Sequence, residues 1–359
     1  MKLLMSLVVR DDADIVDAQI AYHLNAGVDF VIATDHASQD GSAEILESYA
    51  RNGYLQRIPE RGEARDAAWR TEMARIAAHE QQAEWLLDAE PDEFWVPRGE
   101  TLKDVLVAIP PRYGVVQGLV RVFLPRPDDG RLFAERMTVR RAPYASDDES
   151  LGRLDWALRP LYRTSSEIVV GPDRESALDG RVPLRAWYPI EVLRFPVRSL
   201  EHAELRTSGR SGPPEARSKL ELETLEAYQQ GSLRERWAEL AVSDEELSRR
   251  LADGSLVVDE RLRDALGRLE AAGVSEGSPS RRFARPGGGA GHLALRAPNV
   301  VDDVAYAGEC AAVREVDFEP LVGRIAELEQ RITWLEARFW PRVRRRLARV
   351  AGRPRKSAR

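Results

Sequence analysis

Short apolar runs alternate with helical spacings over the first 125 residues of the chain. Four apolar runs predict buried strands, at 3–9, 30–33, 55–58 and 85–87. Apolar residues recur at helical spacing in the segments between them, at 11–27, 42–53 and 63–79. This alternation predicts an α/β domain with a mostly parallel sheet and helices on both faces. Ligands of such sheets bind beyond the carboxyl ends of the strands, so functional residues should directly follow strands.

The sequence after residue 112 completes this domain and predicts a helical extension that follows it. Apolar stretches at 113–124 and 187–195 add strands, and a Ser-Gly-Pro-Pro turn at 211–214 marks a boundary. Helical spacing follows, then a Gly-, Ser- and Pro-rich stretch, and then a short heptad seam between Leu321 and Phe339. We therefore predict five parts: an α/β domain at 1–210, a helical extension at 215–273, a flexible linker at 274–300, a helical segment at 301–340 and a basic tail at 341–359.

Composition narrows the class of protein. With 43% hydrophobic and 31% charged residues, the 359-residue chain can bury a core and is not disordered overall. Cys310 is the only cysteine, which excludes an intramolecular disulfide framework and a cysteine-based metal site. No apolar run reaches the roughly 18 residues of a membrane span, and the opening apolar run lacks a cleavage site of small residues. We therefore expect a cytoplasmic protein.

Charge is distributed unevenly along the chain. The formal net charge is −6, yet residues 340–359 hold nine Lys or Arg and no acid, so the remainder carries about −15. This does not resemble a nucleic-acid binder, which would be basic throughout. The tail interleaves arginines with apolar residues, a pattern that suits peripheral contact with anionic lipid at the inner face of the membrane. A solvated basic terminus is the simpler alternative. The preceding seam could serve helix-mediated self-association or pack on the body of the protein.

An acidic cluster follows the strand at 85–87. Asp88, Glu90, Asp92 and Glu93 occur within six residues. Carboxylates two positions apart in an extended segment point the same way, and hard cations such as Mg²⁺ and Mn²⁺ prefer their oxygens. The spacing alone fits a solvated acidic turn equally well. The large aromatic residues on both sides of the cluster favour burial instead.

A second polar cluster follows the strand at 30–33. Asp35 stands where the strand ends, and its carboxylate could accept hydrogen bonds from a nucleobase or a ribose. Asp40 and Ser42 stand at the start of the next helix. We expect helix capping there, and for Asp40 in particular.

Four motifs occur in the first hundred residues. They are Val-Arg-Asp-Asp-Ala-Asp at 9–14, Thr-Asp-His-Ala-Ser-Gln-Asp-Gly-Ser at 34–42, Trp-Arg-Thr-Glu-Met at 69–73 and Asp-Ala-Glu-Pro-Asp-Glu-Phe-Trp at 88–95. In their order and spacing they resemble the motifs of bacterial family 2-like glycosyltransferases. The resemblance covers roughly residues 1–200. It implies a GT-A fold, a nucleotide-sugar donor, Mn²⁺ or Mg²⁺ on the donor diphosphate, and an inverting transfer to a glycan or lipid-linked acceptor in polysaccharide biosynthesis.

The resemblance also implies roles for individual residues. Asp35 would contact the nucleoside, with Arg10 and Asp12 beside it at the end of the first strand. Glu90 and Asp92 would hold the metal ion. These residues all follow predicted strands, where the ligands of open sheets bind.

The proton of the acceptor hydroxyl needs a base in an inverting transferase, and that base is a carboxylate. We name two candidates, because the sequence does not single out one. Glu93 adjoins the metal motif, and Glu175 lies in a segment that could face the site.

The chain departs from the family pattern at three places. Glu90-Pro91-Asp92 stands where Asp-Ala-Asp is usual, and Arg194 stands where the family often has a histidine. The segment 169–175 lacks a second histidine, and none of the chain's five histidines is an obvious replacement. These departures keep a non-catalytic module that binds a glycan or a partner as the alternative function. A nicotinamide-dependent oxidoreductase is disfavoured, because no Gly-x-Gly-x-x-Gly follows the first strand.

Deletion of residues 341–359 should leave donor hydrolysis nearly unchanged, because chemistry on a dissolved donor does not need a basic tail. It should reduce binding to anionic vesicles. Binding of the full chain should weaken as salt rises, since exposed charges are screened beyond about 8 Å at physiological ionic strength. Vesicle co-sedimentation at low and high salt is the measurement. If the full chain does not bind anionic vesicles at low salt, the tail does not contact membranes and is a solvated terminus.

Overall fold

The computed structural model describes residues 1–59, 66–98, 101–142, 158–171, 182–185, 187–208, 219–287 and 310. Residues 1–309 form one compact unit, and residues 310–359 form a second. The heptad seam, the basic tail and Glu175 lie outside the described residues, so what we expect of them stays a prediction.

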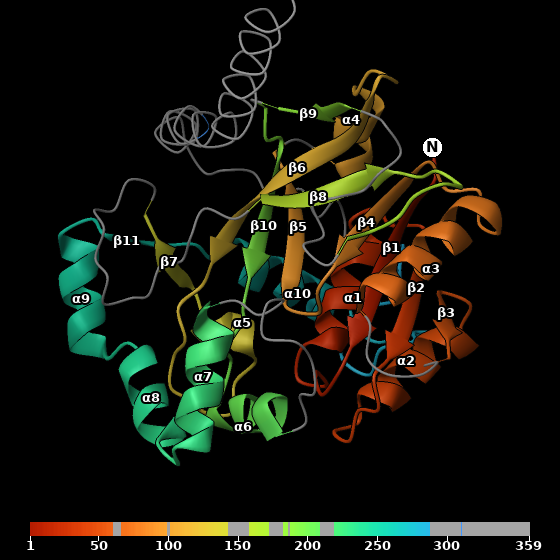
Figure 1. The fold of residues 1–359 in the computed structure, drawn as a ribbon. Coiled ribbons are helices and arrows are strands. Elements are labelled where there is room, and N and C mark those ends of the chain that lie inside the picture. The colour runs from red at the N-terminus through yellow and green to blue at the C-terminus, as the bar shows by residue number, and fades with distance from the viewer. Residues whose placement is uncertain are drawn as a thin grey trace, which may run out of the picture. The chain divides into compact units, whose positions relative to one another are not determined.

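Nine strands in the described residues form one sheet, which runs through the middle of Figure 1. They are β1 (Leu3–Val9), β2 (Phe30–Asp35), β3 (Leu55–Ile58), β4 (Trp85–Ala89), β5 (Glu93–Pro97), β6 (Tyr113–Val122), β8 (Leu158–Arg163), β9 (Val182–Leu184) and β10 (Ile190–Arg194). The order is β3-β2-β1-β4-β8-β6-β10-β5, with β9 beside β6. Only β8 and β5 run antiparallel to their neighbours among these strands. The predicted α/β architecture with a mostly parallel sheet is confirmed.

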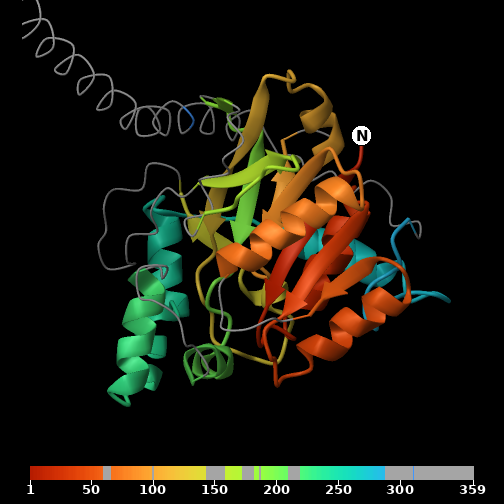
Figure 2. The same cartoon turned by 45° about the vertical axis from the view of Figure 1, so that its right-hand side comes forward.

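Strand β1 is buried on both faces because helices cover each side of the sheet. The helices are α1 (Val16–Asn25), α2 (Ser42–Arg51), α3 (Asp66–His79) and α4 (Leu102–Val107). Leu3 and Leu7 of β1 share a core with α1, α2 and α4. Leu4 and Val8 share a core with α3, which crosses the other face of the strands in Figure 2. Burial on both faces explains why this strand is a continuous apolar run in the sequence.

Helices follow the last strand of the sheet. Helix α6 (Leu200–Ser208) precedes the predicted extension, and the extension contains α7 (Lys219–Gln229), α8 (Leu233–Leu240), α9 (Asp244–Ala252) and α10 (Arg261–Ala271). Within it β11 (Leu256–Val258) pairs with β7 (Val139–Arg141), which follows α5 (Phe133–Arg136) in the sequence. Leu262, Leu266 and Leu269 of α10 pack with Phe94 of β5 and with α1. Helix α10 therefore covers part of α1 and β5 with apolar side chains.

Residues 274–287 are the described half of the predicted linker, and they pack against α1 and α2. Phe283 is buried in the core that α10 shares with α1. The Ser280 hydroxyl donates to Asp17 on α1 at 2.8 Å, and the Ser48 hydroxyl on α2 donates to the Pro279 carbonyl at 2.7 Å. This half of the segment is held by an apolar anchor and by polar contacts, which its Gly- and Ser-rich composition did not indicate.

A buried carboxylate joins α10 to the sheet. Glu191 of β10 accepts hydrogen bonds from Arg121 on β6 and from Arg261 on α10, each at 2.8 Å, and Arg98 lies 3.4 Å away. Burial alone would raise the pKa of Glu191, but Arg261 and Arg121 hold that pKa well below its ordinary value. The ionised carboxylate therefore stabilises the fold at neutral pH.

Glu191→Gln should lower the free energy of unfolding by about 3–5 kcal/mol, because it leaves buried arginines without their carboxylate. Urea denaturation at pH 7 is the measurement, and Glu201→Gln on the exposed side of α6 is the control. A group with a depressed native pKa contributes stability above its unfolded pKa and loses it as the pH falls. The difference between wild type and variant should therefore shrink below about pH 4.5. A difference that does not change between pH 7 and pH 3 would contradict this account.

Candidate functional site

Three polar loops meet at the carboxyl edge of the sheet, as the sequence predicts. The loop 10–14 follows β1, the loop 36–41 follows β2, and residues 90–92 follow β4. Strand β10 ends at the same edge, because Arg194 pairs in register with Glu93 at the start of β5. The edge therefore gathers residues from four separate parts of the chain.

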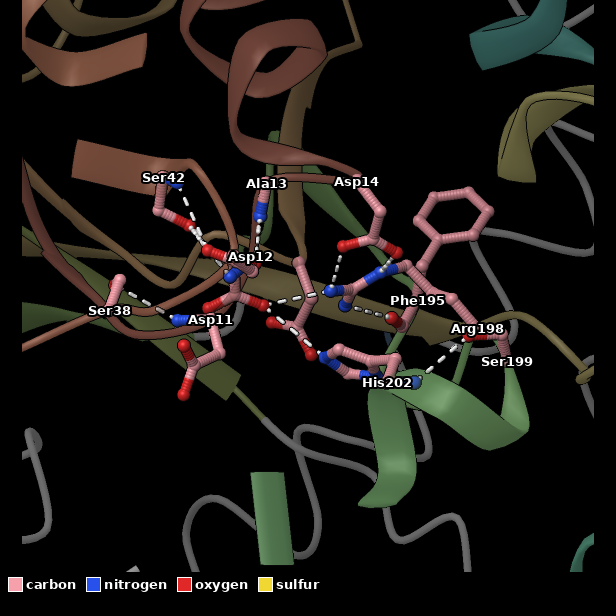
Figure 3. Close-up of polar contacts among 12 residues, drawn as sticks. Asp11, Asp12, Ala13, Asp14, Ser38, Ser42, Phe195, Arg198, Ser199 and His202 are labelled. Carbon is pink, nitrogen blue, oxygen red and sulfur yellow. Dashed lines mark hydrogen bonds and ion pairs between the residues drawn. The ribbon is translucent and has the colours of Figure 1, made fainter. Parts of the chain in front are cut away.

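Hydrogen bonds fasten the first loop to the second (Figure 3). Ser38, Ser42 and Asp40 accept from three consecutive backbone N–H groups of the first loop, those of Asp11, Asp12 and Ala13. The donor–acceptor distances are 3.0, 3.0 and 2.8 Å respectively. A run of amides that all point to one neighbouring loop fixes the shape of both loops.

Asp40 does not occupy the capping position that we predicted for it, because the N-cap of α2 is Gly41 and no side chain caps this helix. Asp40 instead closes a local turn, in which its Oδ1 accepts from the Ser42 backbone N–H at 3.0 Å. Its Oδ2 accepts from the Ala13 N–H of the other loop. Asp11 and Ala37 have φ values of +50° and +52°, which side-chain-bearing residues rarely adopt. The bonds between the loops hold this strained backbone in place.

A buried arginine ties the first loop to the segment between β10 and α6. Arg198 is fully buried and donates to Asp12 at 2.8 Å and to Asp14 at 2.6 and 2.7 Å. It also donates to the Phe195 carbonyl at 3.3 Å. Burial would raise the pKa of Asp14, but Arg198 lowers it below its ordinary value. Figure 3 shows both carboxylates turned toward this guanidinium.

His202 of α6 faces the same carboxylate. Its Nε2 lies 3.4 Å from Asp12 Oδ1, and no hydrogen-bond partner for either ring nitrogen is found among the described residues. Burial and the neighbouring Arg198 lower the pKa of His202, so the ring is neutral at pH 7. The ligand-type atoms of Asp12, Asp14 and His202 lie within 4.8 Å of one another, a geometry that could hold a metal ion. Sequence reasoning missed His202, because no local pattern links it to Asp12.

The acids of the predicted metal motif each bind an arginine. Arg70 on α3 donates to Asp88 and, at 2.7 Å, to Glu90. The other two pairs are Arg194 Nε with Asp92 Oδ2, at 3.2 Å, and Arg159 Nε with Glu93 Oε1, at 2.6 Å. Such pairs suit buried acids, since an ionised carboxylate out of water needs a partner.

These ion pairs disfavour the divalent cation that the resemblance places at Glu90 and Asp92. Glu90 and Asp92 are each bound to a guanidinium, and Asp92 Oδ1 alone of their ligand atoms is buried without a hydrogen-bond partner in the described part of the chain. A Mn²⁺ or Mg²⁺ ion at this pair would lie beside two positive charges. The residues present therefore do not fit the ion well, and the role of Glu90 and Asp92 as metal ligands stays a prediction.

Asp35 and Arg10, which we expect to lie near the nucleoside, stand at the end of β2 and directly after β1. Asp35 Oδ1 is buried and has no hydrogen-bond partner in the described ranges, while Oδ2 lies 4.0 Å from Arg57. Arg10 lies 3.6 Å from the carboxylate of Asp11. A buried acceptor without a partner at the end of β2 is a group that a ligand could satisfy. The contacts of these two residues with a nucleoside stay predictions.

Comparison with known proteins adds only distant similarities. No protein-family model and no curated protein matches the sequence. Among solved structures, S. aureus TarS is 13% identical with a TM-score of 0.31, covering 65% of this chain and 43% of TarS. The chain therefore spans less than half of that protein. TarS 1–349 in complex with UDP-GlcNAc is 14% identical over 69% of this chain and 78% of that one, with a TM-score of 0.32. Similarity at this level does not extend to function.

Arg198→Met should lower the free energy of unfolding by about 3–5 kcal/mol, because Asp12 would stay buried without its partner. Arg234→Met, at an exposed position on α8, is the matched control and should change stability little. Urea denaturation of both variants is the measurement. A value for Arg198→Met within 1 kcal/mol of the control would show that the loops hold their shape without this arginine.

Proposed function

We propose that the protein is an inverting glycosyltransferase, which moves a sugar from a nucleotide-sugar donor to a glycan or lipid-linked acceptor in polysaccharide biosynthesis. The observation that carries the proposal is the meeting of three polar loops, after β1, β2 and β4, at one edge of the sheet. Open α/β sheets bind their ligands at this edge. The same loops hold the motifs that resemble family 2-like glycosyltransferases.

The nucleoside would bind at the ends of β1 and β2. Asp35 Oδ1 is a buried acceptor that a base N–H or a ribose hydroxyl could satisfy. Asp12 already binds Arg198, so we assign it a role in holding the loop after β1 in place. Arg10 directly follows β1 and would contribute positive charge to this site.

The transfer itself needs positive charge and a base. The acceptor oxygen attacks the anomeric carbon from the face opposite the leaving group, and the bond from that carbon to the phosphate oxygen breaks. Negative charge then develops on the diphosphate, where fixed positive groups stabilise it. Glu93 is fully buried and accepts from Arg159 and from the Glu90 N–H, which suits positioning better than proton transfer. Glu175 remains the other candidate base.

A non-catalytic module that binds a glycan or a partner is the second candidate. The pairing of Glu90, Asp92 and Glu93 with arginines favours it, because bound carboxylates are poorer ligands and bases. Donor hydrolysis would distinguish the two, since only the enzyme releases nucleoside diphosphate.

Location at the inner face of the membrane also remains a proposal. No helix within the described ranges is long and apolar enough to cross a membrane. Peripheral contact would come from the basic tail and self-association from the heptad seam, and both lie outside those ranges.

A thermal-shift panel of UDP-, GDP- and dTDP-sugars tests the proposal. A sugar nucleotide held at a hundred times its dissociation constant should stabilise the protein by about 2.7 kcal/mol. Asp35→Ala should weaken that affinity at least tenfold, about 1.4 kcal/mol, whereas Glu44→Ala at an exposed position on α2 should not. Stabilisation by none of the sugar nucleotides would contradict the proposed function. Equal stabilisation of both variants would leave Asp35 as a turn residue.

A further inference from the structure

We propose that Arg194, rather than a resident divalent cation, supplies the positive charge that meets the donor diphosphate. The inference rests on the proposed function and makes nucleotide binding independent of metal. It concerns one position, where the family often has a histidine and this chain has an arginine.

The position of Arg194 suits this role. It is the last residue of β10, at the carboxyl edge where the three polar loops meet. Its Nε lies 3.2 Å from Asp92 Oδ2, so the guanidinium is oriented by the acid that was expected to hold the metal. Arg159 is oriented in the same way by Glu93.

Exposure separates the arginines from their acids. The side chains of Arg194 and Arg159 are 17% and 20% exposed, while those of Asp92 and Glu93 are 2% and 0% exposed. At these two pairs an anion that approaches the edge therefore meets guanidinium before carboxylate, whereas at the third pair Glu90 is 25% exposed and its partner Arg70 is 3% exposed. In the first two pairs the acids lie deeper and orient the arginines, as partners do for groups that bind substrate.

The chemistry of arginine supports the assignment. A guanidinium stays charged at all ordinary pH values, and its planar fork matches two phosphate oxygens. It can therefore neutralise a leaving diphosphate without recruiting an ion.

The same contacts work against a cation held by Glu90 and Asp92. An ion on Glu90 and Asp92 would lie beside Arg70, which binds the first acid, and beside Arg194, which binds the second. An ion on Asp92 Oδ1 alone would lie beside the guanidinium that binds Oδ2 of the same carboxylate. Like charges at such separations repel strongly in a partly buried site.

Calorimetry with UDP, GDP and dTDP, in EDTA and in Mn²⁺, tests the inference. The wild type should bind its preferred nucleoside diphosphate with affinities that agree within twofold in the two buffers. Arg194→Gln should lose at least tenfold in both. Arg194→His, which removes the fixed charge and offers a metal ligand, should lose tenfold in EDTA and recover in Mn²⁺. Arg112→Gln, before β6 at the opposite edge of the sheet, is the control and should bind as the wild type does.

The possible results distinguish a failure of the Arg194 assignment from a failure of the proposed glycosyltransferase function. Wild-type binding that appears only with Mn²⁺ would overturn the arginine assignment and leave the glycosyltransferase proposal intact. Absence of binding to all three nucleotides in both buffers would overturn both. Each variant is also followed by thermal unfolding. If Arg194→Gln does not fold, the double variant Arg194→Gln/Asp92→Asn removes both charges of the pair and should show the same tenfold loss. Wild-type affinity in either folded variant would contradict the role of Arg194.

Discussion

The arrangement of the carboxyl edge depends on the contact of Arg198 with Asp12 and Asp14. Removing a guanidinium from water is costly, and a close set of carboxylates offsets that cost. The contact joins residues 186 positions apart, so the loop after β1 and the segment before α6 fix one another. His202, in the first turn of α6, lies beside this junction, 3.4 Å from Asp12.

The neighbouring loops are built on the same plan, with strained backbone held by polar contacts. Asp11 and Ala37 adopt left-handed conformations, one in each loop. Side chains of Ser38, Asp40 and Ser42 restrain them through bonds to consecutive amides. A site held in this way is organised before any ligand arrives, which reduces the entropy lost on binding.

Local sequence patterns predicted much of the fold but not the ion pairs of the candidate site. The buried strand β1 and the helix α3 could be predicted because burial leaves a regular apolar pattern in the sequence. Strand β5 was not recognised as a strand, because it begins in an acidic cluster whose charges are balanced elsewhere. Its balancing partners, Arg159 and Arg194, lie 66 and 102 residues from the acids they bind. Pairing over such distances leaves no periodicity to detect.

The packing of C-terminal residues on α1 has a consequence for how the chain folds during its synthesis. Helix α10 and Phe283 bury one side of α1, although α1 lies near the start of the sequence. During synthesis the N-terminal half therefore emerges with that side exposed, and it stays exposed until residue 283 has left the ribosome. Exposed apolar surface in a partly folded chain favours aggregation and draws chaperones. The protein should thus mature late, as one cooperative unit, although its first four strands and three helices are local in sequence.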